Sequence, residues 1–130
     1  MADFVHPEFL VETDWLAGHL DDVVLLDCTT HLIPDPQTIY VVKPAREDFE
    51  AGHIPGAQFC NVSRDVSDTT QALNFMRQAP ADFAAAMTRF GISNASRVVT
   101  YSTGNPWWAT RVWWLLREFG QDNAAVLNGG

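Results

Sequence analysis

Cysteine and positive charge are both scarce in this chain of 130 residues. Two cysteines, Cys28 and Cys60, are too few for a disulfide framework, so we expect a cytoplasmic protein. Eight basic residues against sixteen acidic ones give a net charge of −8, which disfavours nucleic acid and anionic membranes as partners. No apolar run approaches the length of a membrane span, and the first residues lack the basic start of a signal peptide.

The composition is that of an ordinary globular protein. Hydrophobic residues make up 47% of the chain and charged residues 18%, which argues against disorder. The length predicts a single domain over residues 1–130. We expect neither a cofactor nor a metal ion.

Short apolar segments alternate with helical patterns along the chain. The expected strands are 9–11, 23–26, 58–62, 98–101 and 123–127, with a further candidate at 38–42. The expected helices are 14–20 behind an N-cap at Thr13, 45–51 ending at a left-handed Gly52, 81–90 with residues 83, 84, 87 and 90 on one face, and a helix ending at Gly120. Segment 29–37 reads as a loop, and 63–78 as a polar, irregular excursion. This alternation predicts an α/β fold, with a parallel sheet of four or five strands and helices on both faces.

The chain is organised around residues 98–120, VVTYSTGNPWWATRVWWLLREFG. A strand runs into six residues that we call the pocket loop, and an apolar helix follows: the loop is Ser102, Thr103, Gly104, Asn105, Pro106 and Trp107. A loop between a strand and a helix N-terminus favours a small anion as its guest.

Four segments in order resemble the rhodanese-like family of thiosulfate and 3-mercaptopyruvate sulfurtransferases. They are the strand ending in Asp27, the turn GHIPGA within residues 49–57, the segment 98–120 and the terminal VLNGG. The tail is most similar to the first domain of the two-domain members, where the pocket is usually vacant. The resemblance therefore implies a rhodanese-like domain that is a fragment of a two-domain protein, with a second rhodanese domain as its partner.

In active family members a cysteine stands first in the loop and carries sulfur as a persulfide, with the loop's backbone N–H groups converging on it. Here that position is Ser102, whose hydroxyl cannot form a persulfide. The resemblance thus implies that this domain is itself non-catalytic. Pro106 also removes one N–H from the loop, and Trp107 adds bulk there.

Four further side chains are candidates for a supporting role. By resemblance, Asp27 and Arg46 stabilise the loops beneath the pocket, the alternative being a polar pair at its rim, and His53 buttresses the fold. Arg111, one turn into the helix, either faces an anion or pairs with an acid such as Asp27. The residues leave these alternatives open.

Two other functions compete with the docking domain. One is a stand-alone regulatory or binding module that holds an anion or peptide in the vacant pocket. The other is a hydrolase built on Ser102, which needs a histidine base. The purely structural alternative is that the Ser102 hydroxyl caps the turn or helix. Four tryptophans within residues 107–114 exceed what one small core needs and predict an exposed apolar face that contacts a second domain or drives self-association.

Overall fold

The computed structural model describes residues 7–128, and its centre is a parallel sheet of five strands in the order β1-β7-β6-β2-β5. The α/β architecture predicted from the sequence is therefore confirmed, with the five-stranded alternative correct. The terminal Gly129 and Gly130 of the VLNGG segment lie outside the described residues. The strands are β1 (Leu10–Val11), β2 (Val24–Asp27), β5 (Gln58–Phe59), β6 (Val98–Tyr101) and β7 (Ala124–Leu127).

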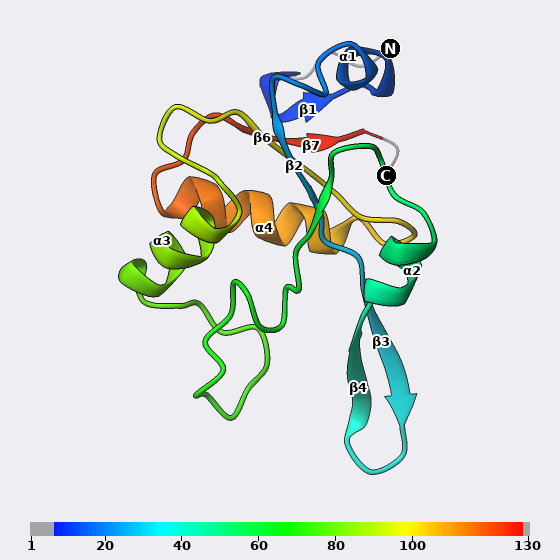
Figure 1. Cartoon of the computed structure of the whole chain (residues 1–130). Helices are drawn as coiled ribbons and strands as arrows, with labels where there is room; N and C mark the ends of the chain where they lie inside the picture. The colour runs from blue at the N-terminus through cyan, green and yellow to red at the C-terminus, as the bar shows by residue number, and fades with distance from the viewer. Residues whose placement is uncertain (1–6, 129–130) are drawn as a thin grey trace.

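Alternate residues of each central strand point to opposite faces of the sheet, and each face is covered by helices (Figure 1). Leu26 and Val98 pack with α3 (Pro80–Arg89) and α4 (Trp107–Glu118) on one face. Leu25 and Val99 pack on the other face with residues of α1 (Thr13–Ala17) and α2 (Arg46–Ala51). Two-sided burial is why the sequence of the inner strands is continuously apolar.

Three local expectations about the helices are wrong. Thr13 lies inside α1, and the residue before the helix is Glu12, which makes no side-chain cap. Gly52 ends α2 with φ 177°, an extended conformation and not a left-handed one. On α3 the buried small residue is Ala86, while Ala84 is exposed.

The largest departure from expectation is a β-hairpin that replaces the predicted loop 29–37. Here β3 (Thr30–Asp35) pairs antiparallel with β4 (Ile39–Pro44) in a separate two-stranded sheet that projects from the body of the molecule (Figure 1). The Asp35 carboxylate stabilises the turn by accepting the N–H groups of Gln37 at 2.8 Å and Thr38 at 3.1 Å. Proline within β3 is tolerated because a two-stranded sheet leaves an edge unpaired.

The carboxyl ends of β2, β5 and β6 bring three chain segments to one edge of the sheet. These are the hairpin, residues 60–79 and the pocket loop. Strand β5 stops at Phe59, earlier than predicted, and 60–79 contains neither helix nor strand, as expected for an excursion. Ligands of open α/β sheets bind at this edge.

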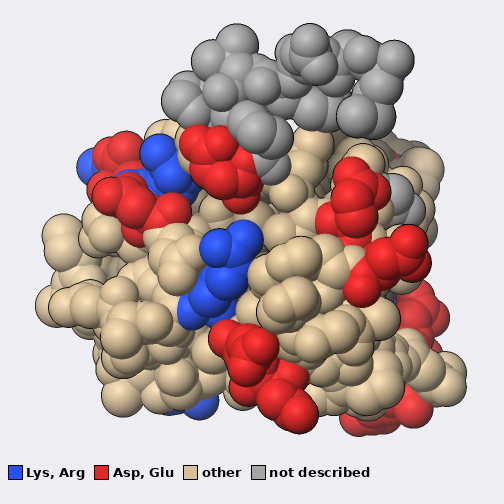
Figure 2. Space-filling model, turned by 90° about the horizontal axis from the view of Figure 1, so that it is seen from above, with Lys and Arg blue, Asp and Glu red and all other residues tan. Residues whose placement is uncertain are grey.

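Acidic side chains are spread over much of the surface. On the face drawn in Figure 2, Asp and Glu gather in several patches near the rim and outnumber Lys and Arg. Within residues 7–128 no helix is both long and apolar enough to cross a membrane.

Candidate functional site

The pocket loop follows β6 directly and buries the side chain at its first position. Ser102 is 1% exposed, and its hydroxyl donates a hydrogen bond to the carbonyl oxygen of Asn105 at 2.6 Å. The Ser102 hydroxyl oxygen also accepts a hydrogen bond from the backbone N–H of Ala109 in α4 at 3.3 Å. Ser102 therefore ties the two ends of the loop together, which is the geometry expected of a capping hydroxyl.

Most backbone N–H groups of the pocket loop are already hydrogen-bonded within the protein. The N–H of Thr103 is donated to the Thr29 hydroxyl at 3.0 Å, that of Asn105 to the Thr103 carbonyl at 3.0 Å, and that of Trp107 to the Asn105 side chain at 2.9 Å. Pro106 has no N–H to offer. The loop thus does not direct a full set of donors at its first residue.

A shallow hollow of about 360 Å³ lies beside the pocket loop. Its walls come from the loop, α4, β1 and β7, and include Ser102, Gly104, Pro106, Thr110, Leu10 and Val126. None of the described residues lining it is charged. Trp107 does not line the hollow and is 71% exposed, so its bulk points largely into solvent.

A buried polar chain connects β2 to the pocket loop. The Asp27 carboxylate accepts the Thr29 hydroxyl at 2.7 Å and the Thr29 N–H at 3.0 Å, and the Thr29 hydroxyl in turn accepts the N–H of Thr103. Because β2 and β6 are neighbours in register, Asp27 lies opposite Tyr101. Asp27 acts on the loop through Thr29, a residue that the sequence reasoning did not select.

Tyr101 links the same region to the GHIPGA turn. Its phenolic oxygen accepts the N–H of Ile54 at 3.2 Å. Burial, followed by the nearby Asp27 charge, raises the pKa of Tyr101 to about 12, although its bond from Ile54 acts in the opposite direction. The signal in the sequence that could have found it is a tyrosine at the end of a buried strand, directly before the pocket loop.

The two arginines predicted to support the site make other contacts. The Arg46 guanidinium lies over the Phe59 ring, 4.7 Å from its centre. Arg111 donates to the carbonyl oxygen of Phe75 at 2.7 Å and lies 5.1 Å from the Trp114 ring centre. Neither forms an ion pair with Asp27 within the part of the chain that the structure describes.

His53 is not placed as a catalytic base for Ser102. Its ring stacks on Phe49 with the centres 3.8 Å apart, and its Nδ1 lies 2.7 Å from the Phe49 carbonyl oxygen. Among residues 7–128, the hydrogen-bond partners of Ser102 are backbone groups only. The arrangement lacks the serine–histidine contact that a hydrolase requires.

Both cysteines are free and wholly buried. Cys28 follows β2 and Cys60 follows β5, its paired neighbour. Burial and the adjacent Cys60 thiol raise the pKa of Cys28 well above its ordinary value, which opposes thiolate formation. Across residues 7–128 no group of histidine, cysteine and acidic side chains is arranged to hold a metal ion.

Comparison with known proteins identifies the fold and the family. The family profile of the Rhodanese-like domain matches residues 12–130. The chain belongs to the rhodanese-like family. It is 35% identical to the 3-mercaptopyruvate sulfurtransferase of Escherichia coli over 130 residues and 36% identical to the thiosulfate sulfurtransferase of Cricetulus griseus over 129 residues. The crystal structure of the E. coli 3-mercaptopyruvate sulfotransferase SseA matches with a TM-score of 0.78 at 34% identity, covering 94% of this chain.

These rhodanese-like relatives are much longer than this chain. The matches cover 94% and 93% of this chain but only 42% and 41% of the two enzymes, and 45% of the SseA chain. The matched part corresponds to the N-terminal domain portion of the relatives, as the resemblance of the tail had predicted. The domain is thus one rhodanese unit of the sulfurtransferase kind.

Proposed function

We propose that this rhodanese-like domain is non-catalytic and serves as the structural docking partner of a catalytic rhodanese domain in a sulfurtransferase. The observation that carries the proposal is the environment of Ser102. A hydroxyl with both of its hydrogen bonds satisfied stands at the family's cysteine position, and the nearby loop N–H groups are bound to other atoms. Because the pocket loop contains no cysteine, no persulfide can form there.

The cysteines present give the domain no alternative nucleophile. Cys28 and Cys60 are both 0% exposed, and burial raises the pKa of Cys28, which opposes the thiolate that sulfur transfer requires. A cytoplasmic location is part of the same proposal, since both thiols are unpaired.

A docking role is supported by the apolar side chains that α4 and residues 60–79 leave at the surface. Trp107, Trp114, Leu73 and Met76 are all exposed. Of the four clustered tryptophans, Trp108 is buried in the core, whereas Trp107 and Trp114 leave apolar surface exposed. The partner that we propose is a second rhodanese domain, and relatives more than twice as long as this chain have room for one outside the matched part.

The proposal is tested by assaying the purified 130-residue chain for thiocyanate production from thiosulfate and cyanide, and for pyruvate production from 3-mercaptopyruvate. The full-length E. coli relative is the positive control. We expect rates equal to the protein-free blank and no sulfur-mass adduct on intact protein. Thiocyanate above the blank, with a persulfide mapped to Cys28 or Cys60, would show that the domain is catalytic through a residue other than Ser102.

A further inference from the structure

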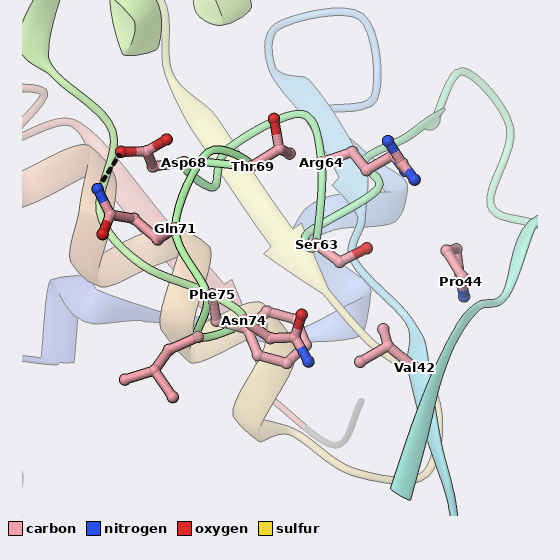
Figure 3. A pocket seen from close by; sticks show the side chains of 10 residues that line it. Val42, Pro44, Ser63, Arg64, Asp68, Thr69, Gln71, Asn74 and Phe75 are labelled. Carbon is pink, nitrogen blue, oxygen red and sulfur yellow. Dashed lines mark hydrogen bonds between the residues drawn. The ribbon is translucent and has the colours of Figure 1, made fainter. Parts of the chain in front are cut away.

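A second cavity, separate from the hollow beside Ser102, opens between the hairpin and residues 63–75 (Figure 3). It measures about 370 Å³, within the size range of small-molecule sites, and it shares no lining residue with the hollow at the pocket loop. Val42 and Pro44 of β4 form one wall, and residues between Ser63 and Phe75 form the other.

Arg64 is the one cation that lines this cavity. Its backbone N–H donates to the Asn61 carbonyl oxygen at 3.1 Å, but its guanidinium makes no hydrogen bond, ion pair or ring contact among the described residues. Five of the other arginines are engaged: Arg46, Arg77, Arg97, Arg111 and Arg117 contact rings, side chains or carbonyl oxygens. The Arg64 guanidinium therefore keeps all of its donors for a ligand.

The acid in the cavity wall does not neutralise Arg64 by a direct contact. The Asp68 carboxylate accepts the N–H and hydroxyl of Thr70, and the Gln71 amide, and these bonds lower the pKa of Asp68. Figure 3 draws Asp68 and Gln71 facing each other on the side of the segment away from the hairpin, whereas Arg64 and Asn74 lie on the side facing Val42 and Pro44. The Asn74 amide has no partner among the described residues and adds a neutral donor.

The apolar part of the wall is held in a strained but braced conformation. Phe75 has φ 64°, a left-handed conformation that bulky side chains rarely adopt. Its ring contacts Trp108 at 5.0 Å between centres, and its carbonyl oxygen accepts Arg111 at 2.7 Å. Strain that the surroundings maintain in this way is a feature of binding sites.

We propose that this cavity binds a small organic carboxylate. The Arg64 guanidinium pairs with the carboxylate, the Asn74 amide donates a further hydrogen bond, and the short apolar part of the ligand lies between Val42 and Phe75. An inorganic oxyanion can accept from Arg64 and Asn74 but has no apolar part to lie between Val42 and Phe75, so the geometry favours an organic ligand. The site is independent of Ser102 and of sulfur chemistry, so it stands whether or not the domain is catalytic.

The test is a titration of the ¹⁵N-labelled 130-residue chain with sodium butyrate, followed by backbone amide shifts. We expect saturable shifts confined to residues 39–44 and 63–75, with a roughly millimolar dissociation constant for so small a ligand. Butanol and sodium sulfate, which carry the tail alone and the charge alone, are expected to bind at least about tenfold more weakly.

Arg64→Gln is expected to weaken butyrate binding by about tenfold or more, because a charge-assisted hydrogen bond is lost. Arg117→Gln is the matched control, since it removes the same charge and Arg117 lines neither this cavity nor the adjoining hollow that Arg64 also lines. An absence of saturable shifts, or equal butyrate affinity in Arg64→Gln and the parent chain, would overturn the site. Sulfate that binds as tightly as butyrate would overturn the assignment of an organic carboxylate.

Discussion

Replacing Ser102 by cysteine restores the family's nucleophile without restoring the surroundings that a thiolate needs. The serine hydroxyl donates to the Asn105 carbonyl oxygen at 2.6 Å, but a thiolate has no proton to donate and meets that oxygen as a repulsive dipole. Only the Ala109 N–H points at the position as a donor. We therefore expect Ser102→Cys to give a buried, ordinary thiol with no sulfurtransferase turnover.

The size of the effect follows from the donors that are absent or committed. Loss of one donor from an oxyanion-type cradle costs about 2.7–4 kcal/mol, or 10²–10³ in rate. Pro106 supplies no N–H, and the N–H of Thr103 is already bound to Thr29. A thiol whose pKa stays near or above its usual value of about 8.5 is only about 0.3% ionised at pH 6, so it alkylates roughly 10²-fold more slowly than a thiol with a pKa of about 6.

The assay is a pH profile of iodoacetamide labelling, with peptide mapping to separate position 102 from the buried Cys28 and Cys60. Urea unfolding of Ser102→Cys confirms that the variant is folded, with a loss of about 1–3 kcal/mol expected from the disturbed hydrogen bonds. Adding Pro106→Gly returns one N–H to the loop and is expected to lower the pKa of the new thiol by about one to two units. Fast labelling at pH 6 together with sustained turnover in the single variant would refute the reasoning.

Three further predictions concern the elements around the pocket loop. Thr29→Val removes the hydrogen bonds of the Thr29 hydroxyl with Asp27 and Thr103, and we expect it to lower the free energy of unfolding in urea by about 2–3 kcal/mol. The control is the exposed Thr88→Val, for which we expect a loss of less than about 0.5 kcal/mol. The raised pKa of Tyr101 in the folded state means that the free energy of unfolding is expected to decrease as the pH rises from 10 to about 12. Urea unfolding measured across this pH range checks this, and Tyr101→Phe is expected to make the decrease smaller. Because Trp107 and Trp114 are exposed, we expect the chain to associate as its concentration rises in sedimentation experiments. The double variant Trp107→Gln, Trp114→Gln is expected to associate less. A parent chain that stays monomeric at high concentration would contradict this prediction.

The sheet could be predicted because its strands carry the signal themselves. Val98 and Val99 face opposite cores, and a run that is apolar on both faces indicates an inner parallel strand. The hairpin could not be predicted in the same way. Its strands are mostly exposed, its turn depends on the Asp35 side chain, and Ile39 adopts φ 72°, a conformation that favours glycine. Nothing in the local sequence marks that position as a turn.

The partners of the candidate site could not be predicted, for a different physical reason. Each depends on which strands are neighbours, and that order is not written in any one segment. Asp27 and Thr103 are joined through Thr29 only because β2 lies beside β6, which brings together Thr29 and Thr103, 74 residues apart in the chain. Arg111 likewise binds the Phe75 carbonyl oxygen across 36 residues of chain, because residues 60–79 return along α4.

Charge alone left the partner of Arg111 open between an anion and an acid such as Asp27, because a guanidinium donates to whichever oxygen lies within reach, and here that is the Phe75 carbonyl oxygen. Burial lowers the pKa of Arg111, and Arg77 adds to that effect, so pairing with a carboxylate would have been favourable. The Asp27 carboxylate, however, accepts both donors of Thr29, which holds it on the pocket-loop side of β2. Arg111 therefore braces the strained Phe75, and a substitution there is expected to act on the wall of the second cavity and to leave the pocket loop unchanged.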